Sequence, residues 1–313
     1  MQSVQNGVNR LRNYLLTQSW FTSKLLPSLP RSVRWGLRSL YFMPFDLVDT
    51  ITGRRDKMMP PRSQNFTGSV DDFMTSARMH IRRLSRIAGL TPHSRMLDVG
   101  CGMGRLATAL IDYLAEDGRY DGFDIVPAGV KWAQEHVAAG HPNIHFVLAD
   151  IYNKEYNPGG KLKAIDYRFP YDDATFDLAV LISVFTHLVP GDLEHYVSEI
   201  ARVLKPGGRC YATFALIDEE AKKGMAEGRA EFQFKPMLPS PHWATGDRVE
   251  ELAVAYEVPY VKDLYARYHL DGDYTIYYGT WSGRASTPTP TSSDAPDSKP
   301  DVIVQDIVVS ARR

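Results

Sequence analysis

The feature that most constrains this chain is a regular alternation of apolar runs and amphipathic stretches between residues 95 and 216. Apolar runs of strand length precede stretches whose apolar residues recur at helical spacing, and glycine or proline separates the two. Parallel strands need long crossover connections, which helices usually supply. The alternation therefore predicts an α/β domain with a doubly wound, mostly parallel sheet whose two faces are covered by helices.

The same pattern gives approximate bounds for each element. Strands are expected at residues 95–99, 120–124, 144–149, 176–182, 209–216, 274–280 and 302–309. Helices are expected at residues 74–88, 106–117, 127–139, 193–204 and 248–270.

Local signals refine these elements. Ser69 and Asp72 resemble a capping signature before the first helix, and Asp192 is expected to cap the fourth. Residues 206–208, Pro-Gly-Gly, are expected to end that helix and lead into the fifth strand. Residues 218–247 show no clear period and are expected to form a long loop or lid.

Composition divides the chain into segments of different kinds. Residues 1–57 carry nine Lys or Arg and three Asp, which makes them a basic arm, whereas the rest of the chain has an excess of acids. Residues 58–282 are expected to form the main domain, because Pro60 and Pro61 stop a helix from crossing the boundary. Residues 283–300 hold four Pro and seven Ser or Thr, which predicts a disordered linker inserted in that domain. Residues 301–313 then supply its last strand.

The basic arm also has an amphipathic pattern. One face of an expected helix holds Arg31, Arg34 and Arg38. Another face holds the apolar residues Val33, Leu37, Leu40 and Tyr41. A basic, aromatic and amphipathic segment of this kind can lie in a membrane interface. It can equally pack on the main domain or on a second subunit, so a membrane surface and a homo-oligomer both stay open.

Charge and cysteine content exclude several classes of function. The net charge of −1 does not favour nucleic acid as a partner. Cys101 and Cys210 lack metal-ligand spacing, which predicts no metal site, no disulfide and a reducing compartment. The sequence shows neither a spanning run of about 18 apolar residues nor a signal peptide. We therefore expect a cytoplasmic protein that is soluble or bound peripherally at the inner face of the membrane.

The strongest motif lies between the first expected strand and the next helix. It is the run Leu97-Asp98-Val99-Gly100-Cys101-Gly102-Met103-Gly104-Arg105. Glycines at this place let the backbone approach a ligand closely at a helix N-terminus. A dinucleotide site would require glycine at position 105, where this chain has arginine. The alternative is a glycine-rich turn that binds nothing.

The Asp-x-Gly-x-Gly-x-Gly spacing resembles the first motif of class I S-adenosylmethionine-dependent methyltransferases. Residues 199–208 resemble a second block of that family, and the likeness covers most of residues 66–282 and part of the last strand. The resemblance implies a Rossmann-like fold with a seven-stranded, mostly parallel sheet, an antiparallel last strand, and S-adenosyl-L-methionine as cofactor. In the family, the glycine loop wraps the methionine part of the cofactor, and the acidic residue, here Asp98, helps to hold its amino group. Residues 152–160 and 278–284 resemble a bacterial subgroup with an insertion before strand four.

Further acidic residues follow the next two expected strands. Asp124 closes the second strand, where a carboxylate can accept hydrogen bonds from both ribose hydroxyls, although a solvent-facing turn residue is the alternative. By the resemblance, Asp150 matches the residue that binds the adenine amino group, with Ile151 beside the ring. The expected cofactor-binding set is Asp98, Gly100, Cys101, Gly102, Gly104, Asp124, Ile125, Asp150, Ile151 and Ser183.

His187 follows the fourth expected strand by a few residues and is the candidate catalytic residue. Methyl transfer needs alignment of donor and acceptor and, for a hydroxyl acceptor, removal of a proton, which an imidazole can accept near neutral pH. A structural histidine that ties down a loop is an equal alternative. His242, in the expected lid, and His195, on the exposed side of a helix, are weaker candidates.

These observations favour a methyltransferase that acts on a hydroxyl group of a sugar, glycolipid or other small molecule, while nitrogen and carbon acceptors stay open. One alternative is an NAD-dependent oxidoreductase, against which Arg105 argues. Another is a non-catalytic, membrane-associated scaffold. Asp98, Asp124 and Asp150 argue against it, because a site without a ligand needs none of the three.

Overall fold

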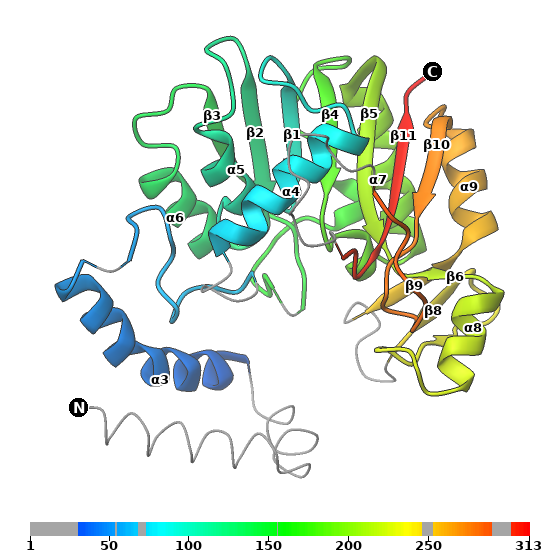
Figure 1. Ribbon diagram of the computed structural model, residues 1–313, viewed down its shortest axis with the longest axis horizontal. Helices are drawn as coiled ribbons and strands as arrows, with labels where there is room; N and C mark the ends of the chain where they lie inside the picture. Colours follow the sequence, from blue (N-terminus) through cyan, green and yellow to red (C-terminus); the bar gives the residue numbers. More distant parts are fainter. Residues whose placement is uncertain (1–30, 54, 68–72, 155, 246–252, 290–301) are drawn as a thin grey trace. The chain divides into compact units, whose positions relative to one another are not determined.

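The computed structural model describes residues 31–53, 55–67, 73–154, 156–245, 253–289 and 302–313 (Figure 1). The chain divides into two compact units, residues 1–66 and residues 67–313. The described part of the first unit consists of helix α3 (Arg31–Ile51) and the segment that follows it. The expected capping signature at Ser69 and Asp72 lies outside the described residues.

The second unit is built around a seven-stranded sheet with the order β10-β11-β5-β4-β1-β2-β3. Its strands are β1 (Arg95–Val99), β2 (Arg119–Asp124), β3 (Ile144–Leu148), β4 (Phe176–Leu181), β5 (Leu204–Phe214), β10 (Gly272–Tyr277) and β11 (Asp306–Ala311). Strands β1 to β5 are parallel, and β11 is antiparallel to both β5 and β10. The expected fold, a mostly parallel seven-stranded sheet with an antiparallel last strand, is confirmed.

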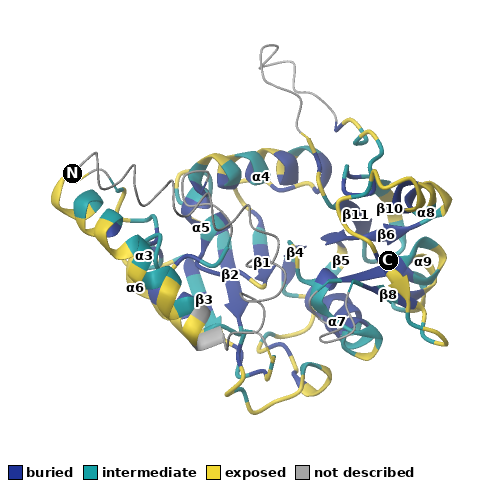
Figure 2. Cartoon of the chain, turned by 90° about the horizontal axis from the view of Figure 1, so that it is seen from below, coloured by how far each residue is buried: buried dark blue, intermediate teal, exposed yellow. Residues whose placement is uncertain are grey.

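Helices cover both faces of this sheet (Figures 1 and 2). Helices α4 (Phe73–Ile87) and α5 (Arg105–Leu110) lie on one face, and α7 (Pro190–Val203) lies on the other. Helix α6 (Pro127–His136) connects β2 to β3, and α9 (Val258–Arg267) packs in the same core cluster as α7. The side chains of α7 at i, i+3 and i+4 spacing are buried in that cluster, as their pattern predicts.

Helix α8 (Glu219–Ala226) and two strands of a second, smaller sheet lie within residues 218–247, which were expected to form a loop. The order of this sheet is β6-β9-β8-β7, and its strands are β6 (Leu216–Ile217), β7 (Lys235–Pro236), β8 (His242–Ala244) and β9 (Val254–Glu257). The prediction of a loop was wrong because strands of two to four residues are too short to show a period. The prediction of one helix over residues 248–270 was also wrong, since β9 precedes α9 and residues 246–252 lie outside the described part.

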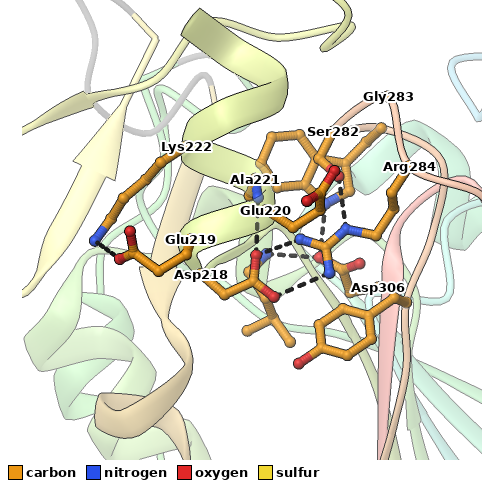
Figure 3. A network of polar contacts seen from close by, with 12 residues as sticks. Asp218, Glu219, Glu220, Ala221, Lys222, Ser282, Gly283, Arg284 and Asp306 are labelled. Carbon is orange, nitrogen blue, oxygen red and sulfur yellow. Dashed lines mark hydrogen bonds and ion pairs between the residues drawn. The ribbon is translucent and has the colours of Figure 1, made fainter.

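Polar contacts tie the second sheet to the end of the first. Arg284 donates to both carboxylate oxygens of Asp218, which also caps α8 by accepting from Ala221 N at 2.8 Å (Figure 3). Asp306, the first residue of β11, accepts from Leu216 N at 2.7 Å, Gly279 N at 2.8 Å and Trp281 Nε1 at 2.6 Å. One buried carboxylate therefore joins three segments that are distant in the sequence.

Two expected helix and strand ends differ from the structure. The N-cap residue of α7 is Val189, and Pro190 occupies the first turn, so Asp192 is not the cap. Asp192 instead lies in that first turn, where a carboxylate is favoured by the helix dipole. Residues 206–208 do not end the helix, because α7 stops at Val203 and β5 begins at Leu204.

The segment before β11 was expected to be a disordered linker over residues 283–300. Residues 290–301 lie outside the described part, so their disorder stays a prediction. In the described portion, Thr287 N donates to Tyr278 O at 2.8 Å, and Tyr278 N donates to Thr287 Oγ1 at 2.9 Å. The final strand begins at Asp306, four residues later than expected.

Candidate active site

The loop after β1 is tied to the carboxyl end of β2. The backbone amides of Gly100 and Cys101 donate to Phe123 O at 2.9 and 3.0 Å. Gly102 N donates to the carboxylate oxygen Oδ2 of Asp124 at 2.7 Å. The glycine run and Asp124 therefore form one hydrogen-bonded structure at the edge where doubly wound sheets bind ligands.

Three glycines of this loop have a conformation that other residues rarely adopt. Gly100 and Gly104 have a φ of 76° and Gly102 a φ of 59°, all in the left-handed region. A Cβ atom at Gly100 would lie 2.5 Å from Cγ2 of Val184, and one at Gly102 would lie 2.5 Å from Cγ2 of Thr67. The loop therefore packs directly against Val184, which follows β4, so the β1, β2 and β4 ends lie side by side.

Asp98 is buried beneath this loop, and its hydrogen-bond partner was not identified from the sequence. The Tyr120 hydroxyl donates to Asp98 Oδ2 at 2.7 Å. A Cβ at Gly122 would lie 2.7 Å from that hydroxyl oxygen, so glycine at 122 leaves the space through which Tyr120 reaches Asp98. The role of Tyr120 could have been found from the register of β1 and β2, which pairs Asp98 with Gly122. Tyr120 lies two residues before Gly122, on the same face of β2.

The ionisation of Asp98 is strongly affected by its surroundings. Burial raises the pKa of its carboxyl group to about 7, the Tyr120 hydrogen bond opposes the shift, and the charge of Asp124 adds to it. Burial also raises the pKa of Asp124, although its two oxygens accept from Gly102 N and from Val126 N at 2.8 Å. Each oxygen of Asp124 retains a second lone pair that can accept from a ribose hydroxyl.

These residues fit a cationic nucleoside cofactor. Two buried carboxyl groups lie close enough for the charge of one to raise the pKa of the other, and a positive ligand group would relieve that repulsion. Arg105 donates from Nη1 to Thr67 O at 3.0 Å, and its charge opposes part of the rise in the pKa of Asp98. Burial raises the pKa of the Cys101 thiol well above its ordinary value, so this cysteine is no nucleophile.

The other predicted cofactor residues occupy different environments. Ile151 is buried, and Ile125 packs partly buried against the main core. Asp150 is half-exposed, with Lys161 Nζ 3.5 Å from its carboxylate. Ser183, at a φ of 58°, donates from its hydroxyl to Gln305 Oε1 at 3.0 Å, which places it beside the segment that leads into β11.

His187 ends a short 3₁₀ helix, η3 (Phe185–His187), directly after β4. Its ring meets Tyr156 edge to face, with 5.9 Å between the ring centres. The carbonyl of the next residue, Leu188, accepts from the Tyr256 hydroxyl at 2.6 Å. Tyr156 comes from the segment before β4 and Tyr256 from β9, so two segments without sequence motifs contact the candidate base or its loop.

The two weaker histidine candidates lie in different surroundings. His242 is buried on β8, with its Nδ1 2.6 Å from Ser240 Oγ and its ring centre 6.4 Å from that of Tyr256. It therefore lies beside Tyr256, whose hydroxyl bonds the loop that carries His187. His195 lies on α7, half-buried, with Nε2 2.8 Å from Tyr167 O, a contact that gives it a structural role.

Comparison with known proteins identifies the family. The profile of a family described as a methyltransferase domain matches residues 96–208. The ubiquinone biosynthesis O-methyltransferase of Paracidovorax citrulli is 30% identical over 213 residues, which cover 63% of this chain and 80% of that protein. The chain belongs to the class I S-adenosylmethionine-dependent methyltransferases.

A further curated relative and a solved structure are also similar to this methyltransferase. The sterol 4-C-methyltransferase strm-1 of Caenorhabditis elegans is 25% identical over 71% of this chain and 60% of that protein. A TehB-like SAM-dependent methyltransferase from Corynebacterium glutamicum superposes with a TM-score of 0.42 at 15% identity, over 76% of this chain and 88% of that one. The chain spans 60% of the length of the sterol 4-C-methyltransferase and between 32% and 52% of the length of three other curated relatives.

Family membership identifies S-adenosyl-L-methionine as the cofactor, which argues against the NAD-dependent alternative. Within the described part of this methyltransferase, none of the helices has the length and apolar character needed to cross a bilayer. The same part contains no group of three His, Cys, Asp or Glu side chains arranged to hold a metal ion.

Proposed function

We propose that this methyltransferase transfers a methyl group to a hydroxyl of a small molecule, such as a sugar or a glycolipid, with His187 as the base. The observation that carries the proposal is the position of His187 on the loop after β4. Val184 of that loop abuts Gly100 in the glycine run, so the imidazole belongs to the same edge as the loop assigned to the cofactor. His187 is half-buried, which leaves its ring accessible to an acceptor.

The cofactor supplies a methyl group already activated on a sulfonium. We assign its binding to Asp98, Gly100, Cys101, Gly102, Gly104, Asp124, Ile125, Asp150, Ile151 and Ser183. The buried carboxylates favour its positive charge, and Asp124 accepts from its ribose. The role of His187 is to accept the proton of the attacking hydroxyl, which raises the nucleophilicity of the acceptor oxygen as the new bond forms.

Two further observations support a small hydroxyl acceptor. The relative that shows the family is named as a ubiquinone biosynthesis O-methyltransferase. The insertion before β4, which we infer marks a bacterial subgroup of the family, contributes Tyr156 to the surroundings of His187. An aromatic side chain beside the base can pack against the body of a small acceptor.

The location and the domain bounds are part of the proposal. We place the enzyme in the cytoplasm, with the basic arm at residues 1–57 directed at the inner face of the membrane and with no nucleic acid as partner. The catalytic domain spans residues 58–282 and 301–313. Residues 283–300 form the linker.

The test begins with methyl-labelled S-adenosylmethionine, the purified full chain, and a metabolite and lipid extract. The labelled product identifies the acceptor and shows whether oxygen, nitrogen or carbon carries the new methyl group. With that acceptor, His187→Ala should lower kcat by about 10² to 10⁴, the usual contribution of a positioned base. Cofactor affinity, measured by calorimetry, should stay nearly unchanged.

His195→Ala is the matched control, because that histidine lies on α7, bonds the backbone carbonyl of Tyr167, and its loss should leave turnover nearly unchanged. Near-normal turnover of His187→Ala would transfer the role to His242 or to a mechanism without a base. A joint loss of cofactor affinity and stability would show that His187 only ties down its loop. A label found on nitrogen or carbon would overturn the hydroxyl acceptor.

A further inference from the structure

Helix α3 carries a continuous row of exposed aliphatic side chains. Leu37, Leu40, Met43, Leu47 and Ile51 expose between 52% and 75% of their surfaces, and Val33 extends the row at 43%. Their spacing of three or four residues places them on one face of the helix. Figure 2 shows exposed residues recurring along α3. A row of this length is more than the scattered apolar residues of an ordinary surface.

The opposite face of α3 is occupied by the segment that follows the helix. Asp46 is buried and accepts from Arg62 N at 2.7 Å and from Ser63 N at 3.0 Å. The Arg38 guanidinium donates to Asn65 O at 2.6 Å. Trp35 meets Phe66 edge to face. The covered and exposed faces are therefore distinct, and the row of aliphatic side chains is not the side that holds this unit together.

The acidic side chains of α3 lie on its covered face. Asp46 lies 3.6 Å from Arg55, and Asp49 lies 3.3 Å from Arg62, so both acids of α3 are neutralised on the covered side. The aliphatic row contains no charged residue. Residues 1–57 carry nine Lys or Arg against three Asp, so the unneutralised charge of the arm is positive.

We propose that the row from Val33 to Ile51 is a lipid-contacting face, on which α3 lies in the plane of an anionic bilayer surface. The proposal rests on the membrane-facing role proposed for residues 1–57 and assigns it to one face of one helix. An apolar row enters the boundary between headgroups and acyl chains, while surrounding basic residues attract anionic headgroups. A bilayer suits a long, aliphatic and uncharged row better than a protein partner, whose interface would need matching polar groups at its rim.

The test compares the full chain with a double variant, Leu40→Gln and Leu47→Gln. Glutamine keeps a high helix propensity and removes only the apolar contact. Wild-type protein should float with phosphatidylcholine vesicles that contain phosphatidylglycerol, and much less with phosphatidylcholine alone. The double variant should bind about tenfold more weakly or worse. Added salt should weaken the binding of the wild type.

The matched control is Val302→Gln with Val304→Gln, which changes two aliphatic side chains of similar exposure in the second unit. It should bind vesicles like the wild type. Equal binding of the α3 variant and the wild type would overturn the proposal. So would a wild-type dimer, detected by light scattering, that the α3 variant loses, because the face would then bind a second copy. Methyl transfer to a water-soluble acceptor, measured without vesicles, fails only if the proposed function is wrong.

Discussion

The two sides of the active-site edge are assembled in different ways. On the cofactor side, Gly102 and Asp124 are 22 residues apart and bond directly through the loop after β1. On the other side, Asp306 joins β11 to Leu216, which is 90 residues earlier, and to Trp281. Tyr256 reaches Leu188 across 68 residues. The hydrogen bonds between the loop and β2 on the proposed cofactor side thus join residues 22 or 23 apart, whereas those on the proposed acceptor side join residues 25 to 90 apart.

Because of this difference, we expect the two sides to tolerate substitutions to different degrees. The loop after β1 should keep its geometry as long as its glycines and its hydrogen bonds to β2 remain. A site held by distant segments depends on a few buried groups that connect them, because each connection orders a long stretch of chain. Single substitutions at those connecting groups should therefore affect stability most on the acceptor side.

The largest expected effect follows from Asp306→Ala. The change leaves three buried N–H groups, from Leu216, Gly279 and Trp281, without their acceptor. At about 1 to 3 kcal/mol for each buried donor, some of which relaxation recovers, the free energy of unfolding should fall by about 3 to 5 kcal/mol. Denaturant unfolding measures it. Asp306→Asn, which keeps one acceptor oxygen, should lose less. A loss below that of an ordinary surface substitution would show that the acceptor side does not depend on this connection.

The same contrast explains what could be predicted from the sequence. The succession of β1 to β5 along the chain and the position of α6 follow from patterns within a few residues. Examples are the glycine run and Pro127 in the first turn of α6. The side chains around His187 could not be predicted. Tyr156 and Tyr256 carry no motif, and they reach His187 or its loop only through tertiary contacts.

Some errors also have local causes. Asp192 is a good capping residue, but Pro190 fits the first helical turn and starts α7 earlier. The strands of the second sheet are too short for periodicity to distinguish them from a loop. Tyr120 was missed because its role depends on the empty space at Gly122, which only the pairing of β1 with β2 reveals.

A second prediction concerns the cofactor side. Because the pKa of Asp98 is raised to about 7, its carboxyl group is mostly neutral at pH 6 and mostly ionised at pH 8. A cationic cofactor favours the ionised form, so cofactor affinity should rise by up to about tenfold over that range. The sign for stability is opposite: the free protein binds this proton more tightly than the unfolded chain, so this group's contribution falls as pH rises toward 7.

Calorimetric titration with S-adenosyl-L-methionine at several pH values measures the affinity. Asp98→Asn should bind more weakly and lose this pH dependence, since asparagine has no proton to release but can still accept from Tyr120. If the cofactor affinity of Asp98→Asn changed with pH as that of the wild type does, another group would be responsible for the pH dependence. That result would also mean that the burial of Asp98 does not make the local loop sensitive to pH.

The smallest expected effect belongs to Tyr256→Phe, which tests whether the second sheet acts on the active site. The hydroxyl of Tyr256 holds Leu188 O, next to the candidate base, while the ring stacks on Tyr260 with 5.7 Å between centres. Phenylalanine keeps the ring and removes one hydrogen bond worth about 0.5 to 1.5 kcal/mol, so the loop after β4 should be held less firmly. Turnover should fall by about 2- to 10-fold, with cofactor affinity unchanged. Tyr260→Phe keeps the stacked pair and should leave turnover as it is. If both variants turn over like the wild type, the second sheet does not position His187, and the two sides of the edge work independently.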